Sequence, residues 1–155
     1  MSGFVGKSIH SLDDKGRLVI PSKFAKKIAA DTASLFVMKT PEGALDLYEP
    51  KAWEEKERAL AKLDDLKSEE RLLKTLLYQS LEEAELSRTA VKDSVTHRIV
   101  ITKDLQEHLG VSKDANEVVL VGGGNKFSIW KPEKLQRAVS ENQEMLETLT
   151  SRHLQ

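Results

Sequence analysis

Cysteine is absent from this chain of 155 residues, and aromatic side chains make up only 5% of it. A chain without cysteine has no disulfide framework, no zinc–thiolate site and no thiol nucleophile. No run of about eighteen apolar residues is present, which argues against a transmembrane helix. The first residues also lack the apolar core of a secretory signal. We therefore expect a cytoplasmic protein without a membrane partner.

The usual motifs of enzyme sites are also missing. The glycine-rich stretch at residues 122–125 follows an apolar run, but it lacks the ending of a phosphate-binding loop and the spacing of a dinucleotide fingerprint. The four histidines show no metal-ligand spacing. We therefore expect no catalytic residue, no metal, no cofactor and no small-molecule substrate.

The charge of the chain is small in total but unevenly distributed. Its net charge is −1, with 32% charged and 39% hydrophobic residues, which is ordinary for a folded, soluble protein. Residues 1–28 carry six basic and two acidic side chains, whereas residues 51–86 carry seven basic and ten acidic ones. This distribution is either a chance feature of a solvated surface or the sign of a basic face that binds an anion.

The sequence repeats itself at an offset of 81 residues. Gly16–Ile28 (GRLVIPSKFAKKI) aligns with His97–Leu109 (HRIVITKDLQEHL), so that Arg17 corresponds to Arg98. With one residue of slippage, Leu45–Trp53 (LDLYEPKAW) aligns with Phe127–Leu135 (FSIWKPEKL). Each copy reads as turn, strand, short helix, strand, turn and strand, which is a β-α-β-β unit. One such unit buries too little apolar surface for comfortable stability, so we expect two units to share a core in a pseudo-twofold body.

Local signals place the strands and short helices of both units. Strands are expected at residues 35–38, 44–48 and 118–121, with a hairpin turn at 122–125. Thr102 is expected to cap a helix at Lys103–Leu109, and Gly110 fits the left-handed position after it. In the first copy, Ser22 is expected to cap Lys23–Ile28.

Helical patterns follow each unit. Leucines at helical spacing predict a pair of antiparallel helices across Lys51–Gln79, with the turn near Asp64–Ser68. A weaker pattern predicts one amphipathic helix in the C-terminal tail. These helices either cover their own sheet or make contacts between subunits, and both can hold at once.

With these motifs in place, the chain resembles the MraZ family of bacterial DNA-binding proteins. The resemblance rests on DDKGRLVIPSKF, LDLYEPKAW, HRIVITKDLQEHLGV and VVLVGGGNKFSIWKPEKL, in this order, and it spans residues 3 to about 135. It implies an α+β fold of two tandem SpoVT-AbrB-type units that form a swapped-hairpin β barrel. The implied boundaries are 3–50 and 87–132 for the units, 51–86 for the helical connector and 133–155 for the tail.

The resemblance also implies a function. Members of this family are transcriptional regulators that form ring-like homo-oligomers, associate with the nucleoid and bind repeated double-stranded sites before the division and cell-wall gene cluster. The family's DxxxR motif falls on Asp13 and Arg17. We expect the spacing of the DNA repeats to match the spacing of subunits, because linked weak sites gain from avidity.

The residues of this loop suggest how it would bind DNA. Lys15 supplies a charge for phosphate, Gly16 allows a positive φ and a close approach of the backbone to the duplex, and Arg17 offers a fork for guanine. Asp13 would orient Arg17 or cap the turn. Lys23 and Lys26 are weaker candidates for flanking contacts. The alternative is a purely structural role, in which the loop is a β-turn closed by an Asp13–Arg17 ion pair.

The second copy departs from the motif. Arg98 is retained, but Ser94, Thr96 and His97 replace the expected Asp, Lys and Gly. Arg98 is therefore either a second DNA contact or a packing residue. Two other functions stay open as well, an oligomeric adaptor that binds a partner through the acidic helices and an AbrB-type antitoxin.

Overall fold

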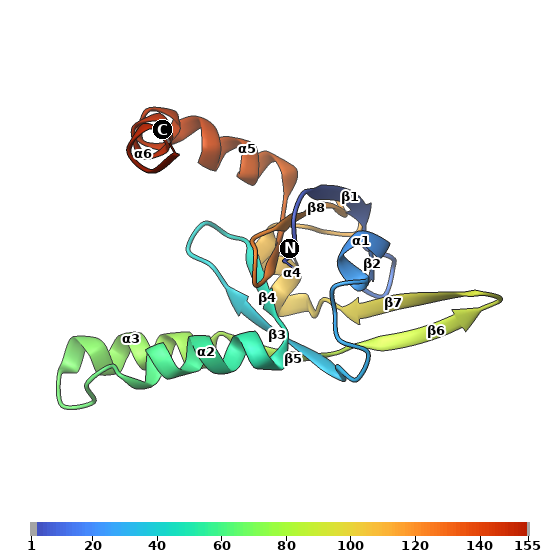
Figure 1. Cartoon of the computed structure of the whole chain (residues 1–155), viewed down its shortest axis with the longest axis horizontal. Helices are drawn as coiled ribbons and strands as arrows, with labels where there is room; N and C mark the ends of the chain where they lie inside the picture. Colours follow the sequence, from blue (N-terminus) through green and yellow to red (C-terminus); the bar gives the residue numbers. More distant parts are fainter. Residues whose placement is uncertain (1–2, 155) are drawn as a thin grey trace.

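The computed structural model describes residues 3–154 as an α+β protein (Figure 1). Its strands are β1 (Lys7–Ser11), β2 (Arg17–Ile20), β3 (Ser34–Lys39), β4 (Leu45–Tyr48), β5 (Leu81–Glu85), β6 (Ser87–Val91), β7 (Ser94–Val100), β8 (Glu117–Gly122) and β9 (Phe127–Trp130). Its helices are α1 (Ser22–Ala25), α2 (Pro50–Ala61), α3 (Ser68–Gln79), α4 (Lys103–Leu109), α5 (Pro132–Glu141) and α6 (Gln143–Leu154). None of these helices combines the length and the apolar character needed to cross a membrane.

Both sheets contain strands from the two halves of the chain. The larger sheet has the order β1-β8-β9-β4-β3-β5, and the smaller one has the order β2-β7-β6. All pairs are antiparallel. The early strand β1 pairs with β8 from the second half, and β5 pairs with β3 from the first half. The halves therefore share their sheets.

Side chains from both sheets and both short helices fill one core. Leu18, Ile99 and Leu120 are fully buried in it. Phe4, Phe24 and Phe127 meet there with ring centroids 5.2–5.8 Å apart. This core draws on β2, α1, β3 and β4 from the first half and on β7, α4, β8 and β9 from the second. Neither half could therefore bury its apolar surface alone.

The predicted helix pair within Lys51–Gln79 is confirmed as α2 and α3, which lie side by side (Figure 1). Trp53 of α2 stacks on Phe36 at 5.7 Å and meets Tyr48 edge-on at 6.0 Å. Helix α2 therefore covers its own sheet, whereas α3 has no buried residue. Residues 81–85, which follow α3 in the segment expected to be the connector, form β5.

The helix ends agree with the sequence in the second unit and differ in the first. As predicted, the Thr102 hydroxyl caps α4 by accepting from Leu105 N (3.4 Å), and Gly110 is left-handed with a φ of 80°. The prediction of a Ser22 cap was wrong, because Pro21 is the N-cap residue and Ser22 already lies in α1. Helix α1 also ends at Ala25 instead of Ile28, and no left-handed glycine closes it as Gly110 closes α4.

The C-terminal tail forms two helices instead of the one expected. Helix α5 ends at Asn142, whose backbone has a φ of −116° and a ψ of 17°. The Asn142 side-chain amide donates to Ala138 O at 2.7 Å, so it competes with the backbone bonds that would continue the helix.

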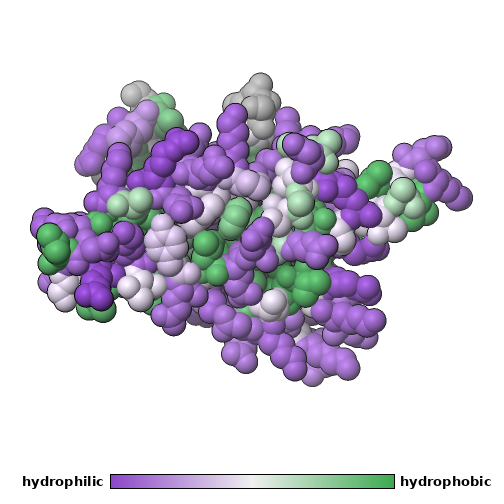
Figure 2. All heavy atoms as spheres, turned by 90° about the horizontal axis from the view of Figure 1, so that it is seen from below, coloured by the Kyte–Doolittle hydropathy of each residue, from purple (hydrophilic) through white to green (hydrophobic). Residues whose placement is uncertain are grey.

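The surface is mostly hydrophilic on the face that Figure 2 shows. Apolar side chains are exposed there at the end where α2 and α3 are joined, and on the β6–β7 hairpin that projects from the body (Figures 1 and 2). Leu66 and Val95 are exposed residues of these two regions.

Candidate nucleic-acid interface

The antiparallel pair β2–β7 presents two arginines on one face. In its register, Arg17 lies opposite Val100, and Arg98 lies opposite Val19. Each such pair of opposite residues is called a rung below. Side chains alternate along each strand, and the Leu18–Ile99 pair between these two rungs is buried. The two rungs therefore lie on the outer face, where Arg17 and both valines are exposed and Arg98 is half-buried.

The repeat offset relates these two rungs to each other. A shift of 81 residues carries Arg17 onto Arg98 and Val19 onto Val100. The rung Arg17–Val100 is thereby carried onto the rung Arg98–Val19. The two arginines occupy equivalent places in the ribbon, although the residues before Arg98 have lost the motif that precedes Arg17.

The loop before β2 is closed by its own backbone. Asp13 N donates to Arg17 O and Gly16 N donates to Asp13 O, both at 3.0 Å. The Asp13 carboxylate accepts from the amides of Lys15 (2.9 Å) and Arg17 (2.8 Å), and from Arg17 Nε at 2.5 Å. Asp13 thus caps the turn and holds Arg17 at the same time.

Electrostatics keep this arrangement in place. The hydrogen bond from the Arg17 backbone is the largest cause that lowers the pKa of the Asp13 carboxyl below its usual value, and the Arg17 side chain adds to it. The carboxylate therefore stays ionised at neutral pH. The contact uses Nε of Arg17, and no bond to its two terminal nitrogens forms within residues 3–154. Those nitrogens are the ones that a bidentate contact with a base needs.

Gly16 also has a role within the chain. Its φ of 76° agrees with the expected positive φ, and the residue is buried. A Cβ at this position would lie 2.6 Å from both Gln106 Nε2 and Ile101 O. A glycine is therefore required here by contacts within the chain, and the close approach of its backbone to DNA stays a prediction.

Long-range hydrogen bonds fix the loop to the second half of the chain. Leu12 N donates to Asn116 O at 3.0 Å, and Asn116 Nδ2 donates back to Leu12 O at 2.7 Å. Ile101 N donates to Gly16 O at 2.8 Å, and Gln106 Nε2 caps Ile101 O at 2.7 Å. Neither Asn116 nor Gln106 could be predicted from the sequence, because Asn116 lies 104 positions from Leu12 and Gln106 lies 90 positions from Gly16.

The three lysine candidates differ in their surroundings. Lys15 is exposed at the tip of the loop. The Lys23 ammonium donates to Lys7 O and lies 5.6 Å from the Phe24 ring centroid, so it is engaged with β1 and α1. Lys26 is exposed on the turn after α1, outside the β2–β7 ribbon.

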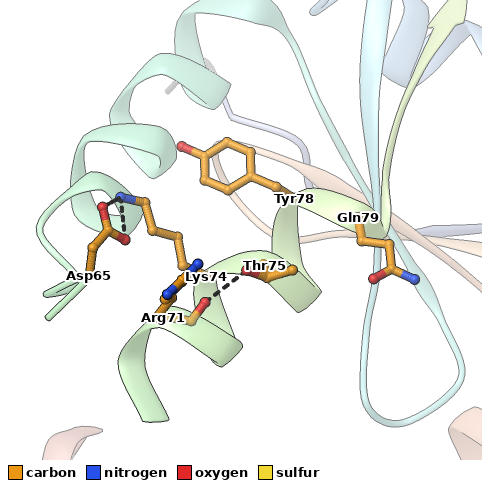
Figure 3. Close-up of a pocket in the computed structure, with 6 residues that line it drawn as sticks. All are labelled: Asp65, Arg71, Lys74, Thr75, Tyr78 and Gln79. Atoms are coloured by element: carbon orange, nitrogen blue, oxygen red, sulfur yellow. Dashed lines mark hydrogen bonds and ion pairs between the residues drawn. The ribbon is translucent and has the colours of Figure 1, made fainter. Parts of the chain in front are cut away.

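Other hollows offer less for chemistry. A hollow of about 770 Å³ beside α3 contains a Lys74–Asp65 ion pair at 3.4 Å, and the Thr75 hydroxyl donates to Arg71 O (Figure 3). Its six lining residues pair no nucleophile with a general base. Residues 3–154 also contain no group of histidines and carboxylates placed to hold a metal ion.

Comparisons with known proteins agree with the sequence pattern. A family model described as "MraZ protein, putative antitoxin-like" matches residues 4–76. The chain is 41% identical to the transcriptional regulator MraZ of Prosthecochloris aestuarii, over 99% of each chain. It is 38% identical to the protein of the same name from Chlorobium phaeobacteroides, over 99% of each, and 37% identical to that from Chlorobaculum tepidum, over 99% of this chain and 100% of the relative.

Proposed function

The chain belongs to the MraZ family, and on this basis we propose that it is a sequence-specific, DNA-binding regulator of transcription. The observation that carries the proposal is the outer face of the β2–β7 pair, where Arg17 and Arg98 occupy equivalent positions within the three-stranded sheet β2-β7-β6. In this proposal the β2–β7 pair enters the major groove of B-DNA, as antiparallel strands do in other DNA-binding proteins, and the arginine fork matches two acceptors of guanine.

Each loop residue has a distinct part in the proposed mechanism. Arg17 reads a base, which contributes about 1–3 kcal/mol of discrimination. Lys15 neutralises phosphate and adds affinity without reading sequence. Asp13 positions Arg17, while Asn116 and Gly16 hold the loop against the second half of the chain. The site is thus ordered before DNA arrives, which lowers the entropic cost of binding.

We further propose that the fold is a pseudo-twofold, swapped-hairpin barrel of two SpoVT-AbrB-type units. The exchange of β1 and β5 between the halves supports it, as does the register of β2–β7 about the Leu18–Ile99 pair. In this proposal the units span residues 3–50 and 87–132, with a connector at 51–86 and a tail at 133–155.

The proposed regulator works as a ring-like homo-oligomer on repeated sites before the division and cell-wall genes, in the cytoplasm at the nucleoid. Leucines that α3 leaves exposed support self-association. A ring would present many copies of one weak site, and linked sites gain about 10²–10⁴ in avidity when their spacing matches. The acidic connector also suits a role as an adaptor or an antitoxin. In either case the protein should not bind DNA, or its binding should not depend on Arg17 and Arg98.

Fluorescence anisotropy with duplex DNA from upstream of the chain's own gene tests the proposal. Arg17→Ala should weaken binding about 5- to 150-fold and reduce the preference for that duplex over a scrambled one. Arg98→Ala should act in the same direction. Arg58→Ala removes an exposed arginine from α2 and serves as the matched control. Sequence-specific binding that survives the loss of both Arg17 and Arg98 would contradict the proposal.

A further inference from the structure

A groove of about 530 Å³ lies beside the loop that precedes β2. One wall is formed by Leu12–Lys15 and the other by the junction of β7 with α4, at Val100–Lys103 and Gln106. The turn at residues 112–116 closes its end. The groove therefore lies between the first and second halves of the chain.

Three lysines line this groove, and two of them come from the second half. Lys15 lies on the loop, Lys103 begins α4, and Lys113 lies on the turn before β8. All three are exposed, and none of them forms an ion pair within residues 3–154. An exposed ammonium without a carboxylate partner is available to a diffusible or macromolecular anion.

Two carboxylates also line the groove, but they do not cancel this charge. Asp13 is already held by Arg17 and by two backbone amides. Arg17 already neutralises Asp13, so among the lining residues only Asp14 opposes the charge of the three lysines. The groove is therefore a basic surface. The walls are also fixed, since Asn116 bonds Leu12 and Ile101 bonds Gly16 across the floor.

The equivalent side of the ribbon is built differently. There, Arg88 of β6 donates to Thr32 O at 2.6 Å and to Ala29 O at 3.3 Å, so its guanidinium is hydrogen-bonded within the chain. Glu49 also accepts from Ala29 N at 3.0 Å and reinforces the same turn. The basic groove is therefore a property of the Arg17 side of the ribbon, and this asymmetry is not apparent from the repeat.

We propose that this groove binds the phosphate backbone of the DNA whose bases the ribbon reads, with Lys103 and Lys113 as phosphate contacts in addition to Lys15. The inference rests on the proposed function. DNA that enters the major groove with Arg17 must carry a phosphate strand past the edge of the ribbon, and the lysine-lined groove adjoins Arg17 through the loop. A bound strand would therefore lie asymmetrically across the two halves of one chain.

The dependence of binding on salt measures such contacts directly. The slope of log affinity against log salt changes by about 0.9 for each phosphate that a protein neutralises on B-DNA. Lys103→Ala with Lys113→Ala should therefore reduce the magnitude of the slope by about 1.8, on the upstream duplex and on a scrambled duplex alike. The ratio of affinities for the two duplexes should stay the same, since phosphate contacts carry no sequence information.

Two further variants sharpen this test. Lys51→Ala with Lys62→Ala removes two exposed lysines from the connector and should leave the slope unchanged. Asp14→Asn removes the carboxylate that opposes the lysines, so it should raise the affinity for both duplexes. A loss of fold would not produce this increase.

The outcomes separate this inference from the proposed function. If the lysine variant keeps the wild-type slope while Arg17→Ala loses the preference between duplexes, the groove is not a phosphate site and the proposed function stands. If the wild-type protein binds neither duplex, both are overturned. A slope that falls equally in the connector control would also overturn the inference, because the effect would then reflect net charge alone.

Discussion

Gly16 shows how one residue connects the loop to the rest of the molecule. Its positive φ could be predicted from the sequence, because glycine between Lys15 and Arg17 in a turn favours that conformation. Its burial against Ile101 could not be predicted, since Ile101 lies 85 positions away, between β7 and α4. The same holds for Asn116, which carries no local signal of its bond to Leu12.

Gly16→Ala should therefore damage both stability and binding. A side chain at a φ of 76° costs about 1–2 kcal/mol, and its Cβ would collide with Ile101 O. The turn would shift and move Arg17 from its place on β2. Chemical denaturation measures the loss of stability, and anisotropy measures the loss of DNA affinity.

Gly124→Ala is the matched control for this change. Gly124 has a φ of 83°, but a Cβ there would meet nothing within 4 Å. This variant should lose a similar amount of stability from the backbone alone and keep its DNA affinity. Equal affinity of the two variants for DNA would contradict the role assigned to Gly16.

Among the elements, the repeat predicted β2, β3, β4, β7, β8, β9 and α4, which carry apolar residues or a clear cap. It missed β1, β5 and β6, none of which has a buried residue. The pairing of β1 and β5 depends on the distant strands β8 and β3, so local sequence could not reveal it. Strand β6 forms a hairpin with the adjacent β7, but it is exposed throughout and therefore has no alternation of buried and exposed residues.

Helix α3 packs Leu77 on the cluster around Trp53 but leaves other leucines exposed. Leu72 and Leu76 lie one turn apart and are 66% and 61% exposed. A second copy of the chain is the partner that the proposed ring requires. Leu72→Ser with Leu76→Ser should therefore lower the mass of the assembly in mass photometry while the thermal stability of the monomer changes little.

The control for this prediction lies on α2. Glu54→Ser with Arg58→Ser changes two exposed residues at the same spacing and should leave the assembly intact. If the leucine variant keeps the wild-type mass, α3 does not carry the subunit contact and the connector becomes a surface for other partners.

For the molecule as a whole, the proposed function depends on which face meets DNA. The large sheet and α2 bury most of their apolar side chains within the chain, whereas β2, β7 and β6 keep one face open with Arg17 and Arg98 on it. Thr89 of β6 lies opposite Thr96 on this same face, next to the ribbon but outside it. It can therefore report on bound DNA without blocking the arginines.

Photo-crosslinking from Thr89 tests whether DNA binds to this face. The chain has no cysteine, so Thr89→Cys gives a single attachment point for a photoactivated label. Leu66→Cys, on the exposed turn of the connector, provides the control. If DNA binds to this face, residue 89 should form crosslinks to the upstream duplex and residue 66 should form few. Equal crosslinking from the two positions, or crosslinks from residue 66 alone, would contradict it.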